Sequence, residues 1–146
     1  MTETPGNPGI FERIVAGELP CYRLHEDEHT LAFLDVGPVA RGHCLLIPKT
    51  RYVELDDVPP EVAAALGQAL PRLVAAVKRV TGCDGVNVLQ NNGEAAGQAV
   101  THVHYHVIPR YAGGGGFRFD WPAGSLVADD AEALRASIHQ ALTETA

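Results

Sequence analysis

The chain reads His102-Val103-His104-Tyr105-His106-Val107-Ile108 in its last third, so that histidines alternate with mostly apolar residues. Successive side chains on a β-strand point to opposite faces, and the alternation therefore predicts a strand over Thr101–Pro109 with its three histidines on one face. These histidines would follow one another at roughly 6.5–7 Å, given a rise of ~3.3 Å per residue. The opposite face would anchor the strand to a core.

Three aligned imidazoles are costly to bury unless each is hydrogen-bonded or bound to a ligand. Besides ordinary surface histidines, two interpretations remain: a zinc site, or catalysis by one histidine with a second as proton donor. No carboxylate that could act as general base lies next to the strand. The loop before it, Asn91–Gln98, contains amides and two glycines, whose backbone can approach an anion closely. The sequence around the histidines therefore favours a bound phosphate over a metal.

The histidine stretch resembles the signature of the histidine triad (HIT) family, His-φ-His-φ-His-φ-φ, where φ is apolar. Further segments follow in the family's order and spacing: Ile10-Phe11-x-x-Ile14, Ala32-Phe33-Leu34-Asp35, Gly42-His43 with Ile47-Pro48-Lys49, and Asn91-x-Gly93-x-x-x-Gly97-Gln98-x-Val100. The chain is most similar to the Hint-type group, whose C-terminal segment resembles Trp121-Pro122-Ala123-Gly124. We expect residues 8–111 to form a HIT domain.

The resemblance implies a purine nucleotide ligand, AMP or one of its conjugates, and cleavage at the α-phosphate through a nucleotidyl-histidine. His104 would be the nucleophile, a role that suits a neutral imidazole with an ordinary pKa of about 6.5. His106 would donate a proton to the leaving group. His102 would orient the nucleophile, and His43 would adjust the properties of the three histidines or relay protons.

The same resemblance implies the nucleotide contacts. An apolar slot would hold the base, Asp35 would accept hydrogen bonds from the ribose, and the glycine-containing loop would hold the α-phosphate. The slot residues are Ile10, Phe11, Ile14 and Phe33, and the loop residues are Asn91, Gly97, Gln98, Ala99 and Val100. Helical spacing alone would also fit Phe11 and Ile14 as core residues, and Asp35 as an acid at a turn.

Two positions depart from the family pattern. Many bacterial relatives carry an N-terminal Cys-x-x-Cys in a structural zinc site, and this chain has Gly9 and Glu12 there. We therefore predict no bound metal and no cofactor. Ala99 stands where Hint-type relatives often have serine, which removes one possible hydrogen bond to phosphate.

The rest of the chain predicts an α+β domain with an antiparallel sheet of about five strands. The expected strands, besides the one that bears the histidines, are Tyr22–Glu26, Thr30–Val36, His43–Pro48 and Gly85–Gln90. A short helix over Ile10–Val15 ends at Gly17. A long helix begins at Pro59-Pro60 and ends at Gly82, with an apolar stripe formed by Val62, Leu66, Leu70, Leu73, Val77 and Val80. Pro71 predicts a kink or break in it.

Both ends of the chain are expected to lie outside this domain. Residues 1–7 would form a flexible N-terminus and Gly113–Gly116 a flexible link. A last helix over Asp129–Leu142 would pack on the domain or on a dimer partner, because family members are commonly homodimers with joined sheets.

The composition narrows the class of protein. A chain of 146 residues with 46% apolar and 20% charged residues fits one globular domain. A net charge of −7 argues against a nucleic-acid binder, and no apolar run is long enough to span a membrane. The three cysteines, Cys21, Cys44 and Cys83, are odd in number and widely spaced, and Met1–Gly9 lacks an apolar signal segment, so we expect a cytoplasmic location.

The expected activity is hydrolysis of a nucleoside 5′-phosphoramidate or adenylate conjugate to a nucleoside monophosphate. The nearest alternative is a dinucleoside polyphosphate hydrolase or phosphorylase, although His106, rather than the glutamine of transferase-type relatives, favours hydrolysis. Two further classes stay open: a nucleotide-binding regulatory protein of low turnover, and a zinc hydrolase that uses the histidines as ligands.

Overall fold

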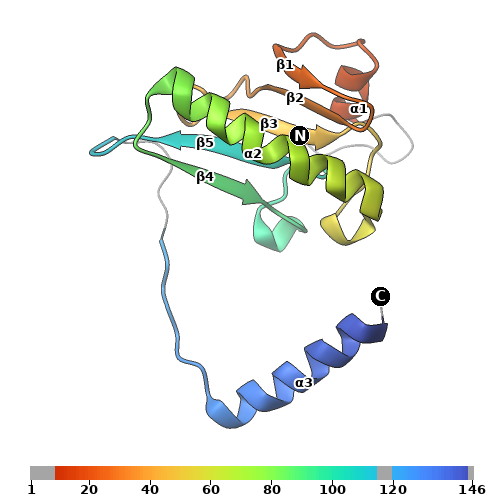
Figure 1. Ribbon diagram of the computed structural model, residues 1–146, viewed down its shortest axis with the longest axis vertical. Coiled ribbons are helices and arrows are strands. Elements are labelled where there is room, and N and C mark those ends of the chain that lie inside the picture. The colour runs from red at the N-terminus through yellow and green to blue at the C-terminus, as the bar shows by residue number, and fades with distance from the viewer. Residues whose placement is uncertain (1–8, 115–119, 145–146) are drawn as a thin grey trace.

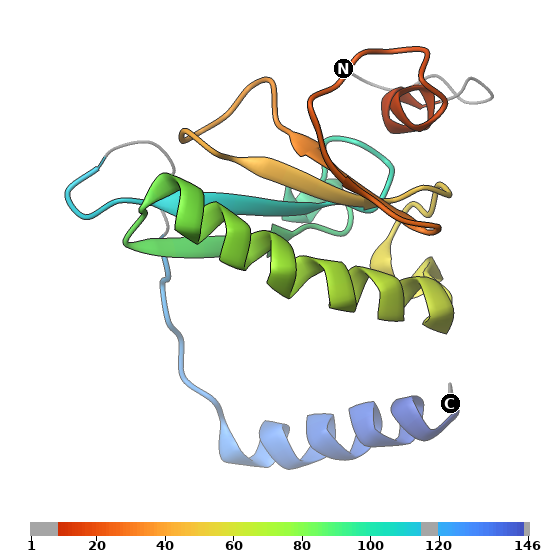
Figure 2. The ribbon, with the colours of Figure 1, turned by 45° about the horizontal axis from the view of Figure 1, so that its top comes forward.

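The computed structural model describes residues 9–114 and 120–144. One five-stranded antiparallel sheet forms its centre, in the order β1-β2-β3-β5-β4. The strands are β1 (Arg23–Glu26), β2 (Thr30–Leu34), β3 (Cys44–Pro48), β4 (Gly85–Gln90) and β5 (Tyr105–Arg110). The long helix α2 (Pro60–Thr81) covers one face, and the short helix α1 (Ile10–Val15) lies on the other (Figures 1 and 2). The predicted α+β class and antiparallel sheet are confirmed.

Helix α2 begins and ends where the sequence indicates. Pro60 occupies its first turn, and Gly82 follows it in the left-handed conformation, with its N–H donating to the carbonyl of Lys78. The helix runs through Pro71 without a break, so that part of the prediction was wrong. A proline removes one backbone hydrogen bond, and the packing of the buried stripe on both sides of Pro71 outweighs that loss.

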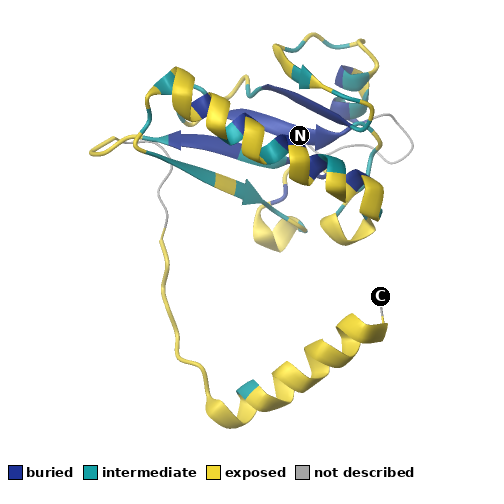
Figure 3. Cartoon of the chain, in the orientation of Figure 1, coloured by how far each residue is buried: buried dark blue, intermediate teal, exposed yellow. Residues whose placement is uncertain are grey.

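Two apolar clusters fill the two faces of the sheet (Figure 3). The cluster under α2 includes Ala32, Cys44, Leu46, Val62, Leu66, Ala69, Leu73, Val77 and Val107. The cluster under α1 consists of Phe11, Ile14, Leu31, Phe33, Leu45 and Ile47. Most of the predicted α2 stripe lies in the first cluster, but Leu70 is only partly buried and Val80 is 76% exposed.

The histidine strand begins later than predicted. Strand β5 starts at Tyr105, and the segment before it is irregular, with His102 and Val103 both fully buried instead of alternating. The ladder between β3 and β5 reaches only as far as the pair Leu46 and Tyr105. Pro48 has no N–H with which to extend the ladder, and its carbonyl accepts instead from the ring of His102. Val103 donates to the carbonyl of Tyr52.

The C-terminal helix α3 (Ala128–Glu144) is confirmed as an element, but it does not pack on the domain. None of its residues is buried, and it lies apart from the sheet in both views (Figures 1 and 2). Its contact with a partner chain stays a prediction. The predicted flexible N-terminus over residues 1–7 lies outside the described residues, as does the second half of the glycine link. Among the described helices, none has the length and apolarity needed to cross a membrane.

Candidate active site

The four histidines of the site come from three places in the chain and meet on the α1 face of the sheet. His106 lies on β5, His102 and His104 lie on the irregular segment before it, and His43 directly precedes β3. The ring centroids of His104 and His106 are 4.9 Å apart, and those of His43 and His106 are 5.2 Å apart. His43, His102 and His104 are buried, whereas His106 is partly exposed. The structure therefore brings together all four predicted catalytic side chains.

A backbone carbonyl determines the tautomer of His104. Its Nδ1 lies 2.7 Å from the carbonyl oxygen of His102, which can only accept a hydrogen bond. The proton of the neutral ring is therefore on Nδ1, and Nε2 carries the lone pair. Within the described residues, this Nε2 has no hydrogen-bond partner and is not fully buried. The ring thus presents an oriented and open nitrogen nucleophile.

His102 supports this arrangement from behind. Its Nε2 donates to the carbonyl of Pro48 over 2.8 Å, and its own carbonyl holds His104. Burial lowers the pKa of His102, although the Pro48 carbonyl opposes the shift. Its Nδ1 is the one buried side-chain nitrogen or oxygen without a partner in the described chain. Burial thus favours the neutral form of this ring, whose hydrogen bonds position its neighbour.

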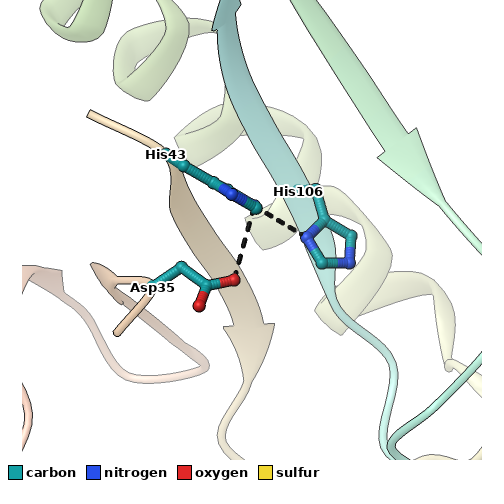
Figure 4. A group of neighbouring side chains, drawn as sticks. All are labelled: Asp35, His43 and His106. Atoms are coloured by element: carbon teal, nitrogen blue, oxygen red, sulfur yellow. Dashed lines mark hydrogen bonds and ion pairs between the residues drawn. The ribbon is translucent and has the colours of Figure 1, made fainter. Parts of the chain in front are cut away.

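His43, His106 and Asp35 form a connected group (Figure 4). The backbone N–H of Val39 donates to Nδ1 of His43, so the proton of the neutral His43 ring is on Nε2. That Nε2 lies 2.9 Å from Nδ1 of His106 and 3.4 Å from Oδ2 of Asp35. His106 accepts at Nδ1, and its own proton is consequently on Nε2, the nitrogen that faces away from His43 (Figure 4).

The buried group favours neutral imidazoles. Burial, followed by the neighbouring His104 and His43, lowers the pKa of His106 to about 4, while the carboxylate of Asp35 opposes the shift. Burial also lowers the pKa of His43, and Asp35 again opposes that shift. The surroundings of His43 and His106 therefore favour the neutral form of both rings.

Asp35, His43 and His106 are also close enough to surround a metal ion, with their ligand atoms within 4.8 Å of one another. The chemistry of His43 does not fit this role. Its Nδ1 lone pair accepts from the Val39 amide, so the Nε2 that faces the other two groups carries a proton. A metal would have to displace that proton and the hydrogen bonds around it. This arrangement does not favour the zinc-hydrolase alternative.

Hydrogen-bonded residues occupy the N-terminal position at which many relatives hold a structural zinc ion. Glu12 accepts from the N–H of Gly9 and from Nη1 of Arg51, which lies 3.2 Å away. Arg51 also donates to the carbonyl and the hydroxyl of Thr101, the residue before His102. This Glu12–Arg51–Thr101 brace joins α1 to the histidine segment. Sequence reasoning missed Arg51, because a single arginine in a loop shows no periodic pattern.

The predicted apolar slot exists beside the histidines. A cavity of about 260 Å³ is lined by Ile10, Phe11, Ile14, Phe33 and Asp35, among others. The Phe11 ring, which lines this cavity, lies edge-on to His104, with ring centroids 5.3 Å apart. The cavity is also lined by residues that were not predicted as site residues: Leu19, Pro20, Cys21, Leu34, Val36 and Leu45. A larger cavity lies on the other face of the sheet, away from all four histidines.

The loop before the histidines is held together by the side chain of Gln98. Its amide nitrogen donates to the carbonyls of Val53 and Val100, and its oxygen accepts from the N–H of Gly93. This engagement leaves no free Gln98 donor for a phosphate, so Gln98 shapes the loop and the backbone is the better candidate contact. Gly97 has a φ of +94°, a conformation that favours glycine, and Asn91 lies next to it. Ala99 is exposed, and Val100 packs on the cluster under α1.

Comparison with known proteins identifies this arrangement. The model of the HIT domain matches residues 16–113, which is more than half of the chain. The chain belongs to the HIT family. The solved structure of a HIT family protein from Bacillus subtilis is 39% identical and superposes with a TM-score of 0.88, over 92% of this chain and 96% of that one.

Two curated relatives carry names that describe an activity. The chain is 42% identical over 114 residues to adenosine 5′-monophosphoramidase HNT1 of Saccharomyces cerevisiae, and the match covers 78% of this chain and 70% of the yeast protein. It is 44% identical over 109 residues to adenylylsulfatase HINT3 of Arabidopsis thaliana. That match covers 75% of this chain, which spans only 55% of the plant protein. These relatives support a Hint-type HIT protein.

Proposed function

We propose that this chain is a nucleotide hydrolase that cleaves at the α-phosphorus of a purine mononucleotide conjugate, of the phosphoramidate or adenylate type, and releases a nucleoside monophosphate such as AMP. The observation that carries the proposal is the open Nε2 of His104, whose lone pair is oriented by a hydrogen bond from Nδ1 to the His102 carbonyl. The names of the yeast and plant relatives support the same class of substrate.

In this mechanism His104 Nε2 attacks the α-phosphorus, and the bond from phosphorus to the leaving nitrogen or oxygen breaks. His106 presents Nε2–H beside the nucleophile, because its Nδ1 accepts from His43. An anionic phosphate next to the ring favours the charged form of His106, which raises its pKa and allows it to donate a proton to the leaving group. Water then attacks the nucleotidyl-histidine and releases the monophosphate.

The base, the ribose and the phosphate have separate places in this proposal. The cavity at Phe11 takes the purine, and backbone N–H groups of the loop before Thr101 stabilise the charge that develops on the α-phosphate. Asp35 lines the same cavity, and in this proposal the remaining lone pairs of its carboxylate oxygens accept hydrogen bonds from the ribose. Oδ1 of Asp35 already accepts from the N–H of Gly37, and Oδ2 lies 3.4 Å from His43. Asp35 therefore links ribose binding to the histidines.

We further propose that the chain acts as a cytoplasmic homodimer without nucleic acid or membrane partners. The three cysteines are free thiols, which suits a reducing compartment. Strand β4 forms an edge of the sheet with Val88 45% exposed, and such an edge is available for pairing with a second copy. The net charge of −7 disfavours a polyanionic partner.

The test is release of AMP from adenosine 5′-phosphoramidate and from diadenosine tetraphosphate by wild type, His104→Ala and the control His139→Ala on the exposed helix α3. We expect turnover of the phosphoramidate by wild type and control, and loss of at least about 10³-fold in His104→Ala. Turnover confined to the dinucleotide would favour the polyphosphate hydrolase. Tight AMP binding without turnover of either would favour the regulatory protein. Activity that survives His104→Ala would exclude the proposed mechanism.

A further inference from the structure

A cavity away from the four histidines of the candidate site lies in a groove between α2 and the β1–β2 edge of the sheet. Its volume is about 360 Å³, and its lining includes Leu24, Leu34, Leu73, Ala76, Val77 and Val80. Two of these apolar side chains are left in water, since Leu24 is 47% and Val80 is 76% exposed. The α2 stripe predicted from the sequence ends at Val80, so the helix continues its apolar face beyond the part that its own sheet covers.

A second exposed apolar surface lies on α3. Leu134, Ile138 and Leu142 recur every four residues, which places them on one side of the helix, and they are 47%, 59% and 64% exposed. A helix of 17 residues without packing is only marginally stable in water. This helix therefore requires a surface that covers its stripe.

The α3 stripe fits within the length of the groove, and the two helices differ in charge. The α2 residues that line the groove extend from Ala69 to Thr81, roughly 18 Å at 1.5 Å per residue, and Leu134 to Leu142 spans roughly 12 Å. Helix α2 carries three basic side chains and one acidic side chain, whereas α3 carries four acidic and one basic. The basic pair Lys78 and Arg79 lies at the end of α2, and the acidic pair Asp129 and Asp130 lies at the start of α3.

We propose that α3 of one copy docks in the α2 groove of a second copy, antiparallel to that α2, and that the second copy returns the same contact. Antiparallel docking places the acidic start of α3 beside the basic end of the partner's α2, and it also aligns the two helix dipoles favourably. The exchange is reciprocal, as a two-fold symmetric dimer requires. This inference rests on the proposed homodimer, to which it adds a specific contact, and it is independent of the proposed chemistry.

The path of the chain favours a second copy over the chain's own groove. Residues 120–127 contain no helix or strand, are all exposed, and lead to a helix that lies away from its own sheet (Figures 1 and 3). An arm held in this way is suited to reach around a neighbouring molecule. The alignment with the Bacillus subtilis structure covers 92% of the chain and so omits about 12 residues, fewer than the 17 of α3.

The first experiment compares Ile138→Asp with Ala136→Asp in the full chain. Both variants place one carboxylate on α3, but position 136 faces away from the Leu134–Leu142 stripe. Sedimentation velocity over a concentration series measures the dimer dissociation constant, and hydrogen exchange measures the protection of the α3 amides. We expect a wild-type dimer with protected α3 amides. Ile138→Asp should raise the dissociation constant at least about 30-fold and remove the protection, as loss of a central apolar contact does, while Ala136→Asp should change neither.

The second experiment tests the groove and the direction of docking. Val80→Asp should weaken the dimer as Ile138→Asp does. Because Val80 is exposed, we expect this variant to stay folded, and a thermal melt checks that it does. Charge reversal in K78E/R79E should also weaken the dimer, and D129K/D130K in the same chain should restore it. Restoration requires that the two pairs face each other, whereas parallel docking predicts no restoration.

Three outcomes would overturn the inference. If the wild-type protein is a dimer and neither Ile138→Asp nor Val80→Asp weakens it, the proposed homodimer is retained and this contact is excluded. A wild-type monomer with unprotected α3 amides would remove both the contact and the proposed homodimer. A wild-type monomer with protected α3 amides would show that α3 docks on its own chain.

Discussion

The two faces of the sheet are built by different interactions. On the α2 face, apolar side chains pack against one another, and Leu66 and Leu46 are almost completely buried. On the α1 face, each histidine of the candidate site is held by a directed hydrogen bond, to Pro48, to Val39, or to another residue of the row. Packing determines stability without specifying which nitrogen carries a proton. The hydrogen bonds of the α1 face specify protons and lone pairs, which is what nucleophilic catalysis requires.

The largest expected effect on stability belongs to the α2 face. Leu66→Ala removes a side chain that is 2% exposed, and we expect a loss of about 2–5 kcal/mol in the free energy of unfolding, measured by urea denaturation. The kcat of the folded variant should equal that of wild type. Gln68→Ala, at an exposed position on the same helix, should change stability by less than about 0.5 kcal/mol. A large fall in kcat in folded Leu66→Ala would mean that the two faces are not separable.

The Glu12–Arg51–Thr101 brace on the α1 face allows the converse test, in which a substitution should change kcat. Arg51→Met frees the segment before His102, and we expect kcat to fall by about 10- to 100-fold through misplacement of His104, with a smaller change in KM. Arg51→Lys should recover only part of kcat, because lysine lacks the planar fork that reaches two partners. Arg13→Met removes an exposed arginine of α1 and serves as the control. Equal kinetics in Arg51→Met and Arg13→Met would show that the brace is purely structural.

A smaller effect follows from the protonation of His106. Its pKa is about 4 in the folded chain, below its ordinary value of 6.5, so between these values the unfolded chain takes up a proton that the folded chain does not. Stability should therefore be fully present above pH 6.5, decrease as pH falls towards 4, and change no further through this group below that. His106→Gln should reduce the slope of unfolding free energy against pH in this window, and His139→Gln on α3 should not. An unchanged slope in His106→Gln would place the titration elsewhere.

Much of the fold follows from patterns that the sequence displays. The stripe of α2, the glycine at its end and the alternation around Val107 predict the elements and the antiparallel class, and the structure confirms them. The errors occur where tertiary contacts compete with local pattern. The strand over Thr101–Pro109 loses its first four residues, since Pro48 cannot extend the ladder, and Val80 leaves the core because the sheet does not reach it.

The candidate site was predictable as a set of residues, but its internal connections were not. The family resemblance names the histidines, the slot around Phe11 and the loop at Gln98. It does not show that Asp35 contacts His43, or that both amide hydrogens of Gln98 are engaged by backbone carbonyls. Asp35 and His43 lie on either side of a turn, and Gln98 reaches Val53, which is 45 positions away. Neither contact is readable from spacing along the chain. Arg51 was missed for the same reason.

The central claim is that His104 Nε2 forms a covalent bond to the α-phosphorus, and the most direct measurement is mass spectrometry of protein quenched at alkaline pH during turnover of adenosine 5′-phosphoramidate. Wild type should carry an adenylyl group that tandem fragmentation locates on His104 and that acid removes, as a phosphoramidate requires. His104→Ala should carry none. An adenylyl group on another residue, or rapid turnover by His104→Ala, would contradict the account.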